Sequence, residues 1–300
     1  MSELNGVLLV DKPSDITSHD VVHKVRKHFQ TKYVGHAGTL DPLATGLMVI
    51  LLGEATKLSN YLLEGDKAYE CEIELGKTTD TLDITGNVLS TNTQFVPFDT
   101  VAEKASQLEG SFEWDIPMYS AKKVGGKKLY ELAREDKSLA EIPKKQMTFY
   151  SVKILSYDFP YLKVSLHCSK GSFIRSWADE LGKSLGVGAC LSGLRRIYSA
   201  PYKIDQSTAL TDLADLGTSY IPLERCLDSW PKLEVSGLDK HLITNGQVSQ
   251  SLKARLKVVN QYYSDVDKLR FRIESKDKKL LAIIEAEPHS NYKLLRVFRA

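Results

Sequence analysis

The chain has 300 residues, of which 42% are hydrophobic and 26% charged, and its formal net charge is +2. This composition predicts a soluble globular protein of one or two domains, and the charge balance excludes a uniformly basic nucleic-acid-binding chain. No window approaches the ~20 apolar residues of a membrane span, and the N-terminus has no signal-peptide core. We therefore expect a cytoplasmic protein with no membrane partner.

The first 75 residues alternate between strand and helix patterns. Strands are expected at residues 6–10, 47–52 and 67–75, and helices at about 18–29 and 54–63. Thr17 and Asp20 have the capping-box spacing that marks the start of the first helix. In the third strand, Tyr69 lies in phase with the apolar residues, so its side chain should point to the core face.

The first helix and the short segment that follows it are rich in cationic side chains. These are Lys24, Arg26, Lys27, His28 and Lys32. A local basic stripe on a near-neutral chain is compatible with a shaped RNA surface. An ordinary solvated face is the alternative, and charge alone does not separate the two.

The rest of the chain predicts further loops, helices and strands. A Thr/Asp-rich loop is expected at residues 78–86, helices at about 99–109 and 172–185, and a strand at 162–168. Residues 111–148, with two prolines, a glycine pair and clustered lysines, predict an inserted loop that contacts substrate and has one short helix near 127–135. After about residue 230, short β-type runs predict a small all-β domain. Because regular βαβ alternation is missing, we expect an α+β fold.

The four cysteines lie far apart and form no C-x-x-C pair. That spacing argues against a disulfide scaffold and against a cysteine-based zinc site. Cys71 and Cys168 fall in the apolar phase of strand patterns, where a thiol packs as a small hydrophobe. We expect structural cysteines and no metal.

The densest unusual segment is residues 35–46, in which three glycines, a histidine and a proline surround Asp41. Pro42 biases Asp41 toward an extended conformation, and glycine permits close approach of another backbone or a ligand. A carboxylate displayed in this way is a candidate nucleophile or base. The alternative is a turn aspartate that caps its own backbone.

Residues 35–46 closely resemble the catalytic signature of the TruB family, the bacterial enzymes that make pseudouridine 55 in the TΨC arm of tRNA. Further blocks resemble the family in the same order. They are residues 6–13, 52–57, 67–70, 79–86, 117–121, 126–130, 167–175 and 193–196. The blocks span about residues 5–200, and the last 100 residues match weakly.

The resemblance implies a pseudouridine synthase fold for residues 1–230: a mixed, mainly antiparallel sheet with flanking helices and a thumb insertion at about 111–148. Residues 231–300 would form an all-β, PUA-like RNA-binding domain. The implied partner is the TΨC stem-loop of tRNA, bound by a monomer. Isomerisation oxidises nothing and adds no group, so we expect neither cofactor nor metal.

The resemblance also implies the roles of single residues. Asp41 would be catalytic, either by attack on C1′ or as a base at C2′, and the sequence leaves both routes open. Tyr69 would stack on the target base. Arg175 would pair with Asp41, and its place at the edge of an apolar helix face fits, because a part-buried guanidinium needs an anionic partner.

Substrate binding is implied for a further set of residues: Lys12, His36, Asp83, Phe173, Leu194, Lys127 and Lys128. His36 would fill the space that the target uridine leaves when it is flipped out of the RNA stack. One departure is Phe173, a position that is often tyrosine in the family. Either the missing hydroxyl is dispensable, or a water or another side chain replaces it.

Two other classes of protein compete with this interpretation. Residues 19–23, His-Asp-Val-Val-His, superficially resemble the H-E-x-x-H zinc helix, although Asp is shorter than Glu and cations share the helix face. The second alternative is an RNA-binding or tRNA-folding protein without catalysis. The loss of Asp41, Tyr69 or Arg175 would have indicated it, and all three are present.

Overall fold

A computed structural model describes residues 4–120, 122–124, 126–129, 142–214, 216–263, 269–287 and 291–299. Within these ranges the main body is an 11-stranded sheet with the path β14-β1-β3-β12-β4-β11-β10-β7. Its long strands are β1 (Gly6–Lys12), β3 (Thr45–Leu52), β4 (Lys67–Leu75), β10 (Lys144–Asp158), β11 (Tyr161–Cys168) and β12 (Ala189–Ser199). The shorter ones are β2 (Val34–His36), β7 (Gly110–Asp115), β13 (Tyr202–Lys203), β14 (Thr208–Ala209) and β15 (Tyr220–Pro222).

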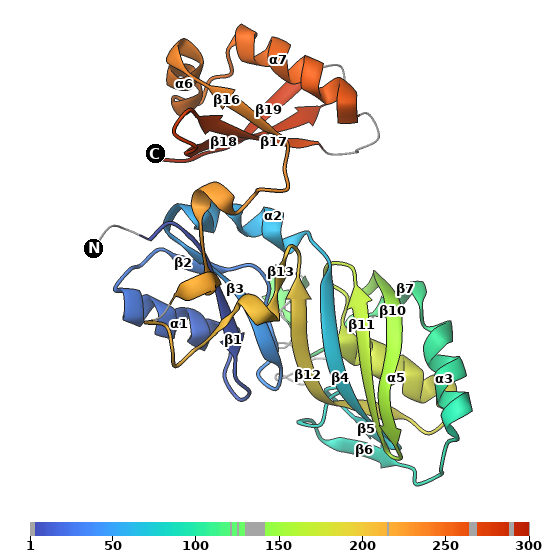
Figure 1. Ribbon diagram of the computed structural model, residues 1–300. Helices are drawn as coiled ribbons and strands as arrows, with labels where there is room; N and C mark the ends of the chain where they lie inside the picture. The colour runs from blue at the N-terminus through green and yellow to red at the C-terminus, as the bar shows by residue number, and fades with distance from the viewer. Residues whose placement is uncertain are drawn as a thin grey trace.

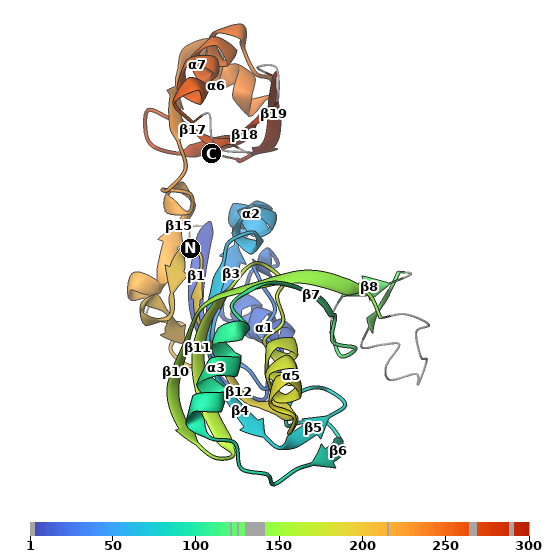
Figure 2. The ribbon, with the colours of Figure 1, turned by 90° about the vertical axis from the view of Figure 1, so that its right-hand side faces the viewer.

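Most neighbouring strands of this sheet run antiparallel, and β12 pairs with β3 in parallel. The predicted mixed, mainly antiparallel sheet is therefore confirmed. Three helices lie on one side of it, α1 (Ser18–Phe29), α3 (Phe98–Gln107) and α5 (Ile174–Leu185) (Figure 2). The described residues of the main body also include the short helix α2 (Ser59–Leu63).

Helix α1 begins where the sequence predicts. The Thr17 hydroxyl accepts a hydrogen bond from the Asp20 amide, and the Asp20 carboxylate accepts one from the Thr17 amide. This reciprocal cap satisfies two amides that have no partner inside the helix. Val21, Val22 and Val25 are buried against the sheet.

Other expectations for the main body need correction. The helix expected at about 54–63 is split into a 3-10 turn, Gly53–Leu58, and α2. The expected loop at 78–86 begins inside β5 (Lys77–Thr79), which pairs with β6 (Val88–Thr91). The ends of the predicted insertion at 111–148 belong to β7 and β10, which pair along the sheet edge. Between them lies a hairpin of β8 (Lys123–Val124) and β9 (Lys127–Lys128); the helix expected near 127–135 lies largely outside the described residues.

The C-terminal part has its own four-stranded sheet, in the order β16-β17-β18-β19 (Figure 1). These strands are β16 (Lys232–Val235), β17 (Arg270–Ser275), β18 (Leu280–Glu287) and β19 (Asn291–Val297). The prediction of an all-β domain was wrong, because α6 (Gly237–Thr244) and α7 (Gln250–Asn260) pack on this sheet. The two helices pack through a few apolar residues, among them Ile243, Leu252 and Leu256. Because these residues are sparse, the sequence showed no helical periodicity here.

The two parts share an apolar contact. Leu280, Ile283 and Phe298 lie in one buried cluster with Leu58 and Leu62 of the main body. At the edge of this contact the Arg270 guanidinium pairs with Glu64 at 2.6 Å. The domain boundary near residue 230 stays a prediction. None of the described helices is long and apolar enough to cross a membrane.

Candidate active site

A cleft of about 670 Å³ opens on the sheet face that carries α1 and α5. It contains five of the predicted site residues: Asp41, Tyr69, Phe173, Arg175 and Leu194. The remaining wall includes cationic and small polar side chains: Thr39, Lys67, Ser120, Lys122, Lys145, Ser172 and Arg196. Residues from six separate stretches of sequence thus converge on one cavity around the Asp41 carboxylate.

Arg196 supports the Asp41 loop through hydrogen bonds to backbone carbonyls. The sequence had not indicated a role for this residue. The guanidinium is 1% exposed and donates to the carbonyls of Leu47 at 2.7 Å and Gly38 at 3.2 Å. At Gly46 the backbone has φ +99°, and a Cβ there would lie 2.4 Å from the Arg196 carbonyl oxygen. Only glycine fits this close approach, which explains the glycine that ends the motif.

Lys12 supports the same loop rather than lining the cleft. Its side chain is fully buried, and Nζ donates to the carbonyls of Pro13, Pro42 and Ala44 at 2.9, 3.1 and 2.6 Å. Burial lowers the pKa of Lys12 to about 8, against the opposing effect of Asp15 and Asp41. An ammonium with all three donors engaged inside the protein has none left for RNA. We propose that Lys12 positions the Asp41 loop and does not bind substrate.

Replacing Lys12 with methionine should therefore lower kcat by about 10²-fold, because a displaced carboxylate reacts poorly, and should change KM for RNA less than about threefold. Lys163→Met, at a lysine on the sheet surface whose side chain is 44% exposed, is the matched control. Steady-state kinetics check both. If KM rose at unchanged kcat, Lys12 would contact RNA directly, as the sequence alone suggested.

Arg175 contacts the Asp41 carboxylate from the first turn of α5. Its Nε lies 3.0 Å from Asp41 Oδ2, and the arginine side chain is 5% exposed against 39% for Asp41. The two terminal nitrogens donate to the carbonyls of Thr81 at 3.0 Å and Tyr119 at 2.9 Å. The guanidinium is thus fixed on three sides, which orients the one carboxylate oxygen that it binds and leaves the other part of Asp41 open to the cleft.

Asp83 lies behind Arg175 rather than in the cleft. Its carboxylate is 3.9 Å from an Arg175 nitrogen and accepts hydrogen bonds from the Thr81 hydroxyl and from the amide and hydroxyl of Thr85. This arrangement shapes the turn that offers the Thr81 carbonyl to Arg175. The predicted substrate contact of Asp83 becomes, in our interpretation, support for the arginine.

Tyr69 packs against two of the buried clusters of the main sheet, on the face predicted from its strand phase. Burial raises the pKa of its hydroxyl, so the phenol is neutral. Phe173 and Leu194 pack beside it at the cleft wall. These three side chains give the cavity an apolar, partly aromatic side suited to a planar ring.

The other predicted contacts are only partly described. His36 ends β2 next to the Asp41 loop, and burial together with the Arg196 charge lowers its pKa, so the imidazole is neutral. Lys127 and Lys128 form the short strand β9, and their side chains are outside the described part. Inside the cleft, Lys122, Lys145 and Lys67 are cationic neighbours that the sequence had not assigned.

The zinc-helix interpretation has no support in the geometry. Asp20 is engaged in the α1 cap with Thr17. In the described part of the chain no group of three or more His, Cys, Asp or Glu side chains is arranged to hold a metal ion. All four cysteines are free and buried, as expected for structural thiols, and burial raises the pKa of Cys71 to about 12.

A carboxylate paired with an arginine in a cleft on a mixed sheet is the arrangement that the sequence resemblance to the pseudouridine synthases led us to expect. A family model described as TruB family pseudouridylate synthase (N terminal domain) matches residues 26–174. The protein named tRNA pseudouridine synthase B of Bdellovibrio bacteriovorus is 44% identical over 99% of this chain and 98% of its own. The protein of the same name from Caldicellulosiruptor saccharolyticus is 46% identical over 75% of this chain and 77% of its own. The chain belongs to the TruB family of pseudouridylate synthases.

Solved structures agree on the fold. A chain of a Cbf5-Nop10-Gar1 complex aligns with a TM-score of 0.68 at 21% identity, over 99% of this chain and 84% of that one. A chain of an H/ACA RNP bound to a substrate RNA containing 2′-deoxyuridine aligns with a TM-score of 0.65 at 20% identity, over 94% and 78%. The pseudouridine synthase fold of the main body is confirmed.

Proposed function

We propose that this enzyme isomerises uridine 55 in the TΨC arm of tRNA to pseudouridine. The observation that carries the proposal is the ion pair of Asp41 and Arg175 at the floor of the cleft. The relatives named tRNA pseudouridine synthase B support a tRNA substrate. The release of tritium from tRNA labelled with [5-³H]uridine tests this proposal, because C5 loses its hydrogen in each turnover.

The reaction requires three events at one nucleotide. The N-glycosidic bond breaks, the uracil turns within the site, and C5 of the base joins C1′ with loss of its hydrogen. Asp41 serves this sequence either as the nucleophile at C1′ or as the base at C2′. Because Arg175 holds one carboxylate oxygen, the other is presented to the sugar in both routes.

The uridine must leave the RNA stack to reach the carboxylate. Tyr69 provides a ring face for the uracil, and Phe173 and Leu194 close the apolar side of the cavity. The neutral imidazole of His36 takes the place of the flipped base in the RNA. Since Phe173 has no hydroxyl, the residue acts here through its ring alone.

The RNA around the target nucleotide would be held by cations. Lys122 and Lys145 lie at one wall of the cleft, and the β8–β9 hairpin extends from that side as the thumb (Figure 2). Leu129, just after β9, is buried with Ile116 against Phe173, which ties the thumb to the base-binding wall. Residues 231–300 contribute a second RNA-binding surface, and the enzyme works as a monomer.

Reversing the charge of the thumb tests this assignment. Lys127→Glu/Lys128→Glu should weaken tRNA binding by roughly tenfold at moderate salt and lower the slope of log affinity against log salt by about 2, as expected for two lost phosphate contacts. Filter binding at several salt concentrations measures both quantities. Unchanged binding at low salt would contradict a thumb that contacts RNA.

A further inference from the structure

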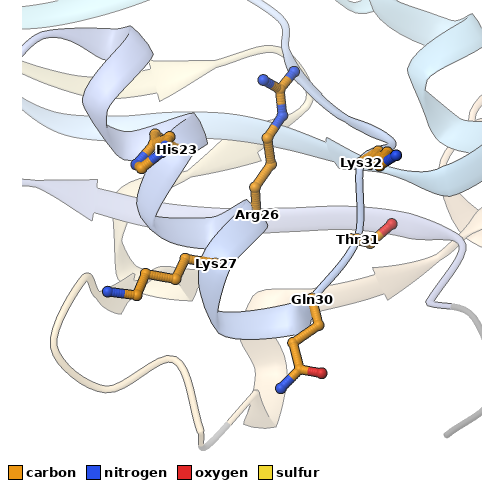
Figure 3. Close-up of a pocket in the computed structure, with 6 residues that line it drawn as sticks. All are labelled: His23, Arg26, Lys27, Gln30, Thr31 and Lys32. Carbon is orange, nitrogen blue, oxygen red and sulfur yellow. The ribbon is translucent and has the colours of Figure 1, made fainter.

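The exposed side of α1 carries cations that the reaction does not use. His23, Arg26 and Lys27 line a shallow hollow of about 640 Å³ together with Gln30, Thr31 and Lys32 (Figure 3). Three of these six side chains are cationic, His23 is a fourth basic group, and no acidic side chain lines the hollow. We call this set of six residues the α1 basic hollow.

The cations of the hollow have no carboxylate partner in the part of the chain that the structure describes. Among the described residues, no carboxylate lies within 4.0 Å of Arg26, Lys27 or Lys32. One nitrogen of Arg26 donates to the Val34 carbonyl at 2.8 Å, while its Nε is buried without a hydrogen-bond partner. Because this Nε is buried, an outside anion would instead meet the exposed ammonium groups of Lys27 and Lys32.

Helix α1 links this hollow to the cleft. Ser18, in its first turn, exchanges hydrogen bonds with the carbonyl and amide of Leu40 at 2.9 and 2.8 Å, directly beside Asp41. The helix has 12 residues and is therefore about 18 Å long. Val21, Val22 and Val25 pack on the same sheet face as Tyr69 and Leu194. The hollow thus lies on the same face as the cleft, at the far end of α1 from Asp41.

We propose that the α1 basic hollow binds the phosphate backbone of the substrate RNA away from the target loop, and this rests on the proposed function. Cations that lack a protein partner on the face of an RNA-binding cleft match a polyanion. The hollow is open and shallow, with its charges spread over one helix turn and the following loop (Figure 3). That geometry suits an extended strand of phosphates better than one enclosed small anion.

A purely structural role is the competing explanation. Arg26, Lys27 and His28 stand in the last turn of α1, where cations stabilise a helix by interacting with its C-terminal dipole. That effect does not involve Lys32, which lies beyond the helix. It also predicts a change in stability instead of a change in RNA binding, so the two explanations can be separated.

The test uses the full-length protein and an unmodified tRNA transcript. Lys27→Gln/Lys32→Gln and Lys27→Glu/Lys32→Glu form a graded pair. Lys104→Glu/Lys153→Glu is the matched control: Lys104 lies on α3 and Lys153 on β10, at the other end of the sheet (Figure 1). Dissociation constants are measured at several salt concentrations, with thermal unfolding and single-turnover isomerisation at saturating enzyme recorded for each variant.

The expected result is a graded loss. The glutamine pair should lower the salt slope by about 2, the glutamate pair should weaken binding by roughly tenfold or more relative to the control, and isomerisation at saturation should stay within about twofold. Binding equal to that of the control would overturn the proposal, as would a loss of thermal stability without a loss of affinity. If the unaltered enzyme bound tRNA but isomerised no uridine, the proposed function would fail while the binding comparison still decided the role of the hollow.

Discussion

Asp41→Asn is expected to bind tRNA with near-normal affinity and to lose uridine isomerisation by at least about 10³-fold, since a nucleophile or base has been removed. The amide keeps the shape of the carboxylate and can still accept the hydrogen bond from Arg175 Nε, which lies 3.0 Å from Asp41 Oδ2. It can neither attack C1′ nor take a proton from C2′. Single-turnover assays of pseudouridine formation, with binding measured in parallel, check the expectation.

Asp15→Asn is the matched control for this variant. Asp15 is exposed, its amide donates to the Pro42 carbonyl in the same loop system, and its side chain bonds only to Ser14 among the contacts seen here. Asparagine also tolerates the left-handed backbone that Asp15 adopts, with φ 66°. Because the Asp15 charge helps to raise the pKa of Lys12, which is about 8, both variants are assayed well below pH 8, where Lys12 stays protonated. Activity of Asp15→Asn should then be within about twofold of the unaltered enzyme. Equal activity losses in the two variants would mean that the loop, and not the Asp41 carboxylate, is what matters.

The second large effect is expected at Arg175. Arg175→Met should lower the free energy of unfolding by about 3 kcal/mol and remove activity as well. The methionine leaves the carbonyls of Thr81 and Tyr119 without their donor and leaves the buried Asp83 carboxylate without its nearby cation. Asp41 loses its orienting partner but stays hydrated, because its side chain is 39% exposed. The midpoint of urea unfolding of the main body measures the change.

Arg195→Met separates burial from charge. Arg195 is the neighbouring arginine on β12 and forms a two-pronged ion pair with Asp11, but its side chain is 40% exposed. The loss of an exposed pair should lower stability by less than about 1 kcal/mol. Equal destabilisation by the two substitutions would contradict the account of Arg175 as a buried organiser of the site.

The parts of the fold that the sequence predicted are those with strong local signals. The capping box of Thr17 and Asp20 located the start of α1, and strict alternation in β4 placed Tyr69 on the inner face. The Asp41 motif was evident because three glycines and a proline within twelve residues are unusual. Such signals depend on neighbours in the chain, so they can be interpreted without a structure.

Arg196, which the sequence did not single out, and Lys12, for which we propose a different role, act over long sequence separations. Arg196 serves the Asp41 loop through the Leu47 carbonyl, 149 positions away, and Lys12 through the Ala44 carbonyl, 32 positions away. A basic residue that donates to backbone carbonyls leaves no partner signature in the sequence. Lys12 was therefore assigned to substrate binding by the family resemblance, and Arg196 was given no role. The strand β12 escaped prediction because its register shifts at Ser192 and Ile197 break the alternation.

The central claim is that this enzyme isomerises one uridine of tRNA through Asp41, and tritium release tests it most directly. C5 of the target uracil loses its hydrogen in each turnover, so tRNA transcribed with [5-³H]uridine releases label only at isomerised positions. The account predicts release equal to one uridine per tRNA, and almost none from Asp41→Asn or from a transcript with cytidine at position 55. No release by the unaltered enzyme, or substantial release by Asp41→Asn, would contradict it.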